Sequence, residues 1–275
     1  MRRLAPASPL LCAVLVVANA AAAAPPGVNA PIPTEPAPLA RTLVQTTADL
    51  EQAIGKWNPK STPAPQPVIL QALYQQRIYR LLTRDSSLAT RTLALAPRDL
   101  RTISRDLLVA QHELYRLTPP IGVHKIKVAR ARPAPELLSY YREAQRRFKI
   151  PWNVLAAVNF VETKLGKLRS ASPAGAQGPM QFMPAIWRRY GLGGNVQDAH
   201  DAIIGAANYL HASGGPQDLR NALHHYNPSS AYVDAVLRYA RRIGADRTMF
   251  YALYNWQVFI KTPRGDRRVT GPGLP

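Results

Sequence analysis

Cysteine, acidic side chains and long apolar runs are scarce in this chain of 275 residues. The one cysteine is Cys12, so no intrachain disulfide and no cysteine-rich metal site is expected. Only 16 acidic residues stand against 35 lysines and arginines, which gives a formal net charge of +19. This imbalance favours anionic partners such as cell-wall polymers, acidic lipid surfaces or nucleic acid.

Common metal and nucleophile motifs are also missing. The chain has no His-Glu-x-x-His, no Gly-x-Ser-x-Gly elbow and no glycine-rich phosphate loop. His224 and His225 are adjacent and would point apart on a helix, while His200 and His211 lack a third ligand. We therefore expect neither a metal nor a cofactor.

The first 24 residues have the pattern of a secretory signal peptide. Arg2 and Arg3 precede a short apolar run at residues 10–17, and Ala18-Asn19-Ala20 fits a small-x-small cleavage site. The run is short for a membrane span, and no later segment is apolar enough to cross a bilayer. The prediction is a protein exported to the periplasm, cell wall or exterior, without stable membrane insertion. Export argues against a nucleic-acid partner. The alternative to a cleaved signal peptide is that this segment remains as an uncleaved anchor.

The amino-terminal half is predicted to be linkers and helices without recognisable chemistry. Residues 25–40 are proline-rich and read as an extended linker, and residues 118–135 as a basic linker. Between them, residues 41–117 show helical periodicity, interrupted by prolines at 59–67. A helix beginning at Pro97 carries a narrow apolar seam, which predicts a small bundle or, alternatively, a face for a protein partner. The seam consists of Leu100, Ile103, Leu107, Ala110, Leu114 and Leu117.

Residues 136–245 are predicted to form a compact helical domain around one buried helix. Residues 152–161 leave no polar face, which is typical of a helix surrounded by protein. Glu162 follows at its carboxyl end, where burial and the helix dipole both disfavour the ionised carboxylate. A raised pKa suits a general acid near neutral pH. The competing interpretation is a glutamate that has emerged into solvent.

Further helices are expected on either side of short loops, followed by a different carboxyl-terminal segment. Pro184 should begin one short helix, Asp198 or His200 should cap the next, and Ser229 or Ser230 should cap the last. A helix is also expected over residues 218–225. Within residues 246–275, strand-forming residues at 256–261 and 267–270 flank a turn, which predicts a small β-hairpin. The fold class is therefore mainly α.

Three sequence blocks around Glu162 carry a family resemblance. Glu162 follows its apolar helix, residues 172–181 read SPAGAQGPMQ with Pro184 shortly after, and Tyr226-Asn227 comes about forty residues later. In this order and spacing the blocks resemble the peptidoglycan lytic transglycosylases of the goose-type lysozyme superfamily, which carry the transglycosylase SLT domain.

The resemblance covers residues 135–243, less than half of the chain, and shows two departures. Thr163 replaces the usual serine after the glutamate, and Pro179 replaces the usual leucine before Met-Gln. The resemblance implies a lysozyme-like helical catalytic domain, to which residues 41–117 would be a helical appendage.

The resemblance also implies a mechanism with one glutamate. Glu162 would protonate the β-1,4 glycosidic oxygen between N-acetylmuramic acid and N-acetylglucosamine in peptidoglycan. As a carboxylate it would then accept the proton of the muramic C6 hydroxyl, which closes a 1,6-anhydro ring. The implied substrate-binding residues are Ser172, Gly178, Met180, Gln181, Tyr190, Tyr226 and Asn227. In this picture Gly178 lets the backbone approach the sugar, Met180 forms an apolar wall, and Tyr226 positions Glu162.

Other functions remain open from the sequence alone. A hydrolytic muramidase would make the same cut with water, and a non-catalytic wall-binding or interaction protein would use the helical amino-terminal region. The remaining carboxylates of the domain favour a site with one glutamate, because they fall on polar helix faces or at helix starts, where capping explains them. These are Glu136, Glu143, Asp198, Asp201, Asp218 and Asp234.

Overall fold

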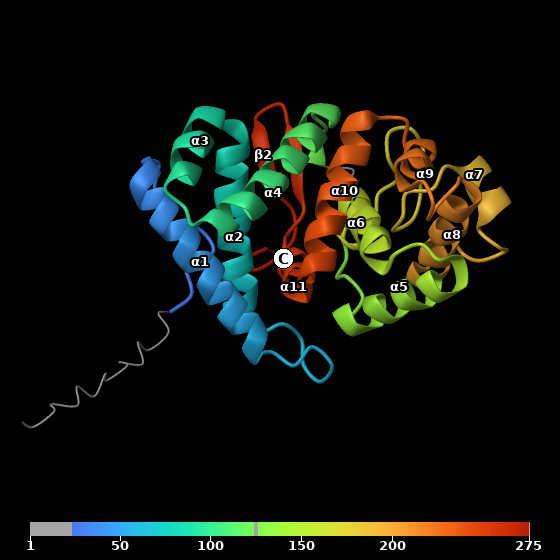
Figure 1. Cartoon of the computed structure of the whole chain (residues 1–275), viewed down its shortest axis with the longest axis horizontal. Coiled ribbons are helices and arrows are strands. Elements are labelled where there is room, and N and C mark those ends of the chain that lie inside the picture. Colours follow the sequence, from blue (N-terminus) through green and yellow to red (C-terminus); the bar gives the residue numbers. More distant parts are fainter. Residues whose placement is uncertain (1–23, 124–125, 275) are drawn as a thin grey trace, which may run out of the picture.

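The computed structural model describes residues 24–123 and 126–274. Cys12 and almost all of the expected signal peptide lie outside the described residues. The described chain is mainly α, as predicted, with one short two-stranded sheet. Figure 1 shows α1, α2 and α3 at one end, α7, α8 and α9 at the other, and α6 and α10 between them.

Four helices form the amino-terminal region. They are α1 (Pro36–Lys56), α2 (Gln66–Arg84), α3 (Ser86–Ala94) and α4 (Arg98–Leu117). The expected linker boundary at residue 40 is wrong, because α1 begins at Pro36 and already buries Leu39 completely. The segment before α1 is also fixed, since Arg77 and Tyr74 donate hydrogen bonds to backbone carbonyls of residues 28–31.

The apolar seam of α4 packs inside the chain. Leu107 and Ala110 are each 1% exposed, and α4 contacts α2 and α10. Asp106 on the same helix is buried among Arg238, Arg241 and Arg242 of α10. The alternative of a free seam for a partner helix is therefore wrong over these buried positions, because α10 covers them.

The basic segment after α4 is held against the body of the molecule at several points. The Ile121 amide donates to the Lys261 carbonyl, and Val128 forms an isolated bridge with Leu168. Next to that bridge, the Ala129 amide donates to Lys167 and the Arg169 amide to residue 127. These backbone hydrogen bonds attach the segment to the rest of the fold, whereas an unattached linker would make none.

Six helices follow, and three of them begin with a side-chain cap. They are α5 (Ala134–Phe148), α6 (Trp152–Thr163), α7 (Pro184–Tyr190), α8 (Ala199–Ala212), α9 (Leu219–Tyr226) and α10 (Ser230–Ala245). Asp198, Asp218 and Ser229 accept backbone amides at the starts of α8, α9 and α10. Helix α6 contacts α5, α8, α10 and α11, which explains why it lacks a polar face.

The carboxyl-terminal segment contains one unexpected helix and the expected hairpin. Helix α11 (Arg247–Asn255) is capped by Asp246 and packs on α1, α2 and α10. Strands β1 (Phe259–Thr262) and β2 (Gly265–Arg268) pair antiparallel across a two-residue turn. The second strand begins two residues earlier than predicted, because Gly265 with φ 104° ends the turn.

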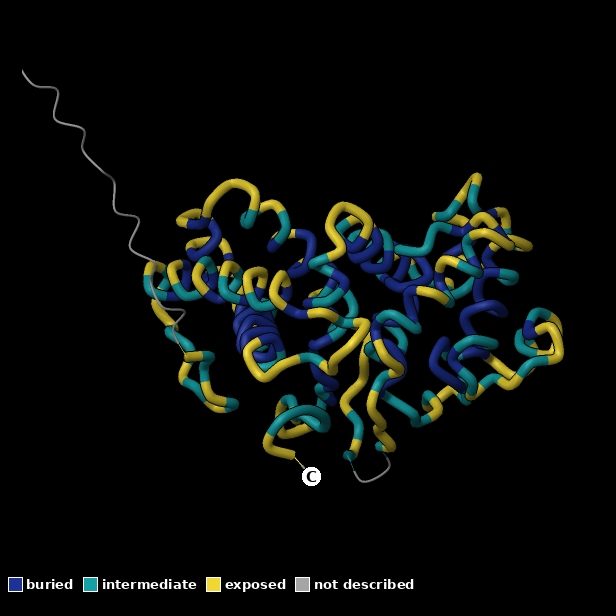
Figure 2. Tube along the Cα trace, turned by 90° about the horizontal axis from the view of Figure 1, so that it is seen from below, coloured by how far each residue is buried: buried dark blue, intermediate teal, exposed yellow. Residues whose placement is uncertain are grey.

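One hydrophobic core connects the amino-terminal helices to the helices around α6. A single cluster of buried side chains extends from Leu39 on α1 to Trp256 after α11. Figure 2 shows the buried trace running through both ends of the molecule, with exposed segments at the loops. Among the described residues, no helix is both long and apolar enough to span a bilayer. The division into an appendage and a catalytic domain stays a prediction.

Candidate active site

Glu162 lies in the last turn of α6, where the buried helix meets the loop region. Its side chain is partly buried, and its carboxylate accepts a 2.7 Å hydrogen bond from the Tyr232 hydroxyl of α10. Tyr232 is itself only 3% exposed. The glutamate therefore has not emerged into solvent, and one fixed donor orients it.

Burial changes the proton affinity of this carboxylate. It raises the pKa of Glu162 to about 7, while the Tyr232 hydrogen bond and the nearby Lys164 cation oppose the rise. A carboxyl group with this pKa is half protonated near neutral pH. It can therefore give up a proton in one step and accept one in the next.

Thr163 connects the end of α6 to the loop that carries the second sequence block. Its hydroxyl donates a 2.6 Å hydrogen bond to the Pro179 carbonyl and accepts one of 2.9 Å from the Gly166 amide. The side chain is 1% exposed. A hydroxyl is needed here, and threonine supplies the same group as the serine that is usual in the resembled family.

The backbone conformation and surroundings of residue 178 require a glycine. Its φ is 73°, and a Cβ there would lie 1.9 Å from the Val196 carbonyl oxygen. The glycine therefore lets two loops of the site touch each other, because residue 196 fills the space that a side chain would need. The expected close approach of its backbone to a sugar stays a prediction.

Met180 and Gln181 complete the turn that begins at Gly178. The Met180 side chain is completely buried in the core, so it does not form an exposed apolar wall as expected. Gln181 has a φ of 49°, and its side-chain amide donates a 2.9 Å hydrogen bond to the Gly178 carbonyl. Both residues therefore shape the turn, and the Gln181 amide folds back on it.

Tyr226 attaches this turn to α9. Its hydroxyl donates a 2.6 Å hydrogen bond to the Met180 carbonyl, whereas the phenol that contacts Glu162 is Tyr232. The sequence predicts that Tyr226 positions Glu162, but the hydrogen bond to that carboxylate comes from Tyr232. Tyr226 still lies within electrostatic range of Glu162, whose charge contributes to the raised pKa of the phenol after the larger effect of burial.

Tyr190 and Tyr226 belong to one row of aromatic rings. Tyr209, which the sequence did not single out, lies between them, with ring centroids 4.7 Å from Tyr190 and 5.6 Å from Tyr226. The row continues through Phe182, 5.8 Å from Tyr226. The three tyrosines are partly exposed, and aromatic surfaces of this kind suit the apolar faces of sugars.

The remaining predicted residues lie in loops. Ser172 closes a tight turn, in which its hydroxyl accepts the Ala176 amide at 3.0 Å and Gly175 adopts φ 89°. Asn227 follows α9, and its backbone amide caps that helix by donating to Leu223. These positions agree with a shaping role, and direct contact with substrate stays a prediction.

The other carboxylates of residues 136–245 have structural partners. Each serves as a helix cap, accepts a loop amide, or joins an ion pair or side-chain hydrogen bond, and none of these interactions involves Glu162. They are Glu136, Glu143, Asp198, Asp201, Asp218 and Asp234. Glu162 is therefore the carboxylate of this region whose surroundings fit acid chemistry.

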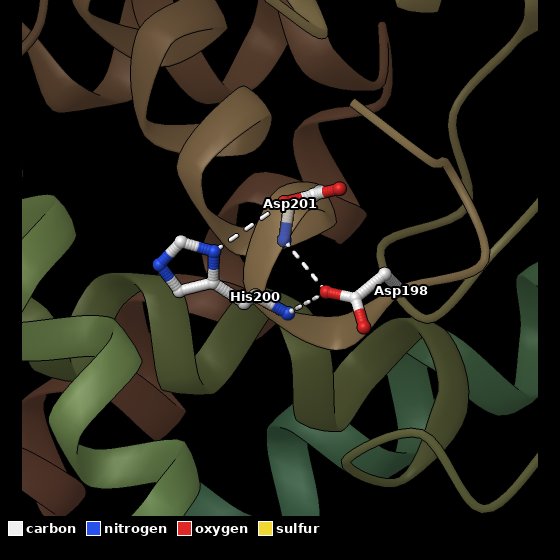
Figure 3. A group of neighbouring side chains, drawn as sticks. All are labelled: Asp198, His200 and Asp201. Atoms are coloured by element: carbon white, nitrogen blue, oxygen red, sulfur yellow. Dashed lines mark hydrogen bonds and ion pairs between the residues drawn. The ribbon is translucent and has the colours of Figure 1, made fainter. Parts of the chain in front are cut away.

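Asp198, His200 and Asp201 are close enough to resemble a metal site. Figure 3 shows that Asp198 accepts the amides of the other two residues, which is the ordinary geometry of a helix cap. Burial lowers the pKa of His200, but hydrogen bonds with Glu143 and Asp201 outweigh it and raise the pKa overall. The cap geometry and the contacts of His200 with Glu143 and Asp201 therefore account for this cluster.

This mainly α arrangement, with one carboxylate of raised pKa at the end of a buried helix, is consistent with a lysozyme-like fold. Residues 139–247 match the family model described as the transglycosylase SLT domain. The chain is also 29% identical over 120 residues to the membrane-bound lytic murein transglycosylase F of Thiobacillus denitrificans (strain ATCC 25259 / T1).

The second match covers 41% of this chain and 25% of that relative, so the chain spans about a quarter of the relative's length. No solved structure matches the chain. The SLT domain that the three sequence blocks predicted is thereby confirmed for this part of the chain.

Proposed function

We propose that the protein is a peptidoglycan lytic transglycosylase that acts in the periplasm or cell wall after export. It cleaves the β-1,4 bond between N-acetylmuramic acid and N-acetylglucosamine. The observation that carries this proposal is Glu162, partly buried, bonded to Tyr232 and with its pKa raised to about 7. The matches to the SLT domain and to a lytic murein transglycosylase support the substrate class.

The reaction uses Glu162 twice. The protonated carboxyl group donates its proton to the glycosidic oxygen, and the bond to muramic C1 breaks as N-acetylglucosamine leaves. The resulting carboxylate takes the proton of the muramic C6 hydroxyl, whose oxygen bonds to C1 and closes the 1,6-anhydro ring. No water is consumed, and the enzyme regains its proton at the end.

The structure supports such a one-residue cycle in two ways. The other carboxylates of residues 136–245 are occupied by caps, loop amides, ion pairs and side-chain hydrogen bonds, which leaves Glu162 without the second acid that glycosidases usually use. Tyr232 can stabilise the carboxylate after the first proton transfer, because its hydroxyl donates to Glu162.

Mass spectrometry of the sugar products tests the proposal. The purified protein and Glu162→Gln are incubated with purified peptidoglycan, and soluble fragments are weighed. Anhydro-muramic ends, one water lighter than hydrolysed ends and absent with the variant, are the expected result. Reducing muramic ends that disappear with the variant would make the protein a hydrolytic muramidase. Binding to the wall without any soluble product would identify a non-catalytic wall-binding protein.

A further inference from the structure

A cavity of about 180 Å³ lies beside the carboxyl end of α6. Its walls come from α2, α4, α6, α10 and the β1–β2 hairpin, so no single sequence segment forms it. In Figure 1 the hairpin lies next to α4, close to α10. The cavity is far larger than the space that one water molecule needs.

Positive charge dominates the lining. Four cationic side chains line the cavity together with one carboxylate, that of Asp266. The four cations are Arg80, Arg84, Lys164 and Lys261. Asp266 already pairs with Arg80 and Arg84, and its side chain is 2% exposed. The protein thus supplies one anion for four cations around this space.

The two lysines of the lining have carbonyls, and not carboxylates, as their hydrogen-bond partners. The Lys164 ammonium bonds to the Phe160 carbonyl at 3.2 Å, and Lys261 bonds to two carbonyls at the end of α4. Burial, followed by the nearby charge of Arg80, lowers the pKa of Lys164 to about 8. Such a cluster is costly, because each cation is partly removed from water and placed near others.

Buried donors without acceptors occur on the same lining residues. Arg80 Nε, Gln111 Nε2 and Trp256 Nε1 are buried and have no hydrogen-bond partner among the described residues. One lining acceptor, Asp266 Oδ1, is also unpaired. Since buried polar groups in proteins are nearly always bonded, an excess of unpaired donors beside cations fits a ligand rich in acceptor oxygens.

The cavity lies at the same end of α6 as Glu162. Val161 and Lys164 line it, and both lie within one helical turn of Glu162. Lys164 is also close enough to Glu162 for its charge to lower the glutamate's pKa. Glu162 itself does not line the cavity, so a substrate whose sugar lies at Glu162 would enter it through a substituent that extends past the end of α6 toward Lys164.

We propose that this cavity binds a carboxylate of the acidic peptide attached to the muramic acid that is cleaved at Glu162. The proposal rests on the proposed function, because that reaction places a peptide-bearing muramic acid at the glutamate. The cations and unpaired donors hold the carboxylate, and the enzyme thereby distinguishes peptide-bearing from bare glycan.

Isothermal titration calorimetry on the full chain tests this binding. The probes are N-acetylmuramyl-L-alanyl-D-glutamate, with two free carboxylates, and its diamide. The unmodified protein should bind the diacid at least about tenfold more tightly than the diamide. Arg84→Gln with Lys261→Gln should remove this preference, and the matched double variant Arg91→Gln with Arg98→Gln, exposed and outside the cavity, should keep it.

Three results would overturn the proposal: no binding of the diacid at millimolar concentration, equal affinity for both probes, or an unchanged preference in the cavity variant. Arg84→Gln alone, at a half-exposed side chain, should reduce the preference about threefold and guards against misfolding of the double variant. The calorimetric measurement of binding does not require the protein to cleave peptidoglycan. Products from peptidoglycan with no binding preference would reject the cavity site, whereas the preference without products would reject the proposed reaction.

Discussion

Tyr232 of α10 donates a 2.7 Å hydrogen bond to Glu162 of α6, although 70 residues separate them in the chain. The bond favours the ionised carboxylate and so lowers a pKa that burial has raised. Tyr232 therefore sets the pH range in which Glu162 can act as an acid.

Removing this hydroxyl should move the alkaline limb of the activity profile. In Tyr232→Phe the carboxylate loses a donor, so the pKa of Glu162 rises above about 7 and the protonated acid persists to higher pH. We expect the fall in turnover on peptidoglycan to shift to higher pH. Tyr226→Phe is the matched control, because its hydroxyl bonds to the Met180 carbonyl; it should leave the limb in place.

Glu162→Gln should abolish turnover and change the pH dependence of stability. Loss of a general acid and base costs at least about a hundredfold in rate. Because the folded pKa is raised, the native state binds the proton more tightly than the unfolded chain, and stability falls as pH rises through about 7. Urea unfolding measures this effect. The difference in free energy of unfolding, variant minus unmodified protein, should be roughly 2 kcal/mol larger at pH 8 than at pH 5. An identical pH dependence would place Glu162 in solvent.

Thr163→Val should impair activity more than stability. The valine keeps the buried volume but cannot donate to the Pro179 carbonyl, which leaves an unpaired carbonyl at a cost of about 1–3 kcal/mol. Thr163→Ser keeps the hydroxyl and should retain most of the turnover. If valine and serine variants turn over peptidoglycan equally, the hydroxyl does not position the loop.

Gly178→Ala should destabilise the protein by about 3 kcal/mol or more in denaturant unfolding, because its methyl would overlap the Val196 carbonyl. Gly193→Ala is the control, with a similar φ of 78° but nothing within 4 Å of the new methyl. It should cost about 1–2 kcal/mol from backbone strain alone. Equal losses in the two variants would show that the loop at residue 196 yields to the methyl group.

Asp106→Asn should test how firmly α4 and α10 are joined. The variant leaves three arginines, whose side chains are 18–59% exposed, without their shared buried carboxylate. The loss should therefore stay below the cost of about 3–5 kcal/mol for a fully buried unpaired charge, but exceed that of an exposed ion pair. Asp234→Asn breaks the exposed pair with Arg220 and should cost less than about 1 kcal/mol. Thermal and urea unfolding compare the two. A small loss at residue 106 would mean that the arginines are paired through solvent.

Local patterns predicted much of the fold. The apolar helix before Glu162 is encoded within a few residues, and so are two caps: Asp198 and Ser229 are each one of the two candidates that the sequence offered for its helix. The cap at Asp218 was not predicted, because the sequence placed that residue inside its helix. The sequence missed α11, because its nine residues follow a helix end and precede a strand pattern.

Long-range partners could not be read in the same way. Tyr232 falls on the inward stripe of α10, where a phenol looks like an ordinary core residue, and only the crossing of α6 shows that its hydroxyl meets Glu162. Tyr209 is similar, since it joins Tyr190 to Tyr226 only after α7, α8 and α9 have packed. The cavity at the end of α6 combines five elements, so no local pattern contains it.

The packing of α4 on α10 has a consequence for dividing the chain into fragments. The segment recognised by the family model, residues 139–247, includes Tyr232 and its helix but excludes the helix that covers α10 from outside. A gene fragment cut at those borders would expose an apolar surface and separate Asp106 from its arginines. A fragment of residues 139–247 is therefore expected to be less stable than the chain that includes α4, because it would lack the partner that covers α10.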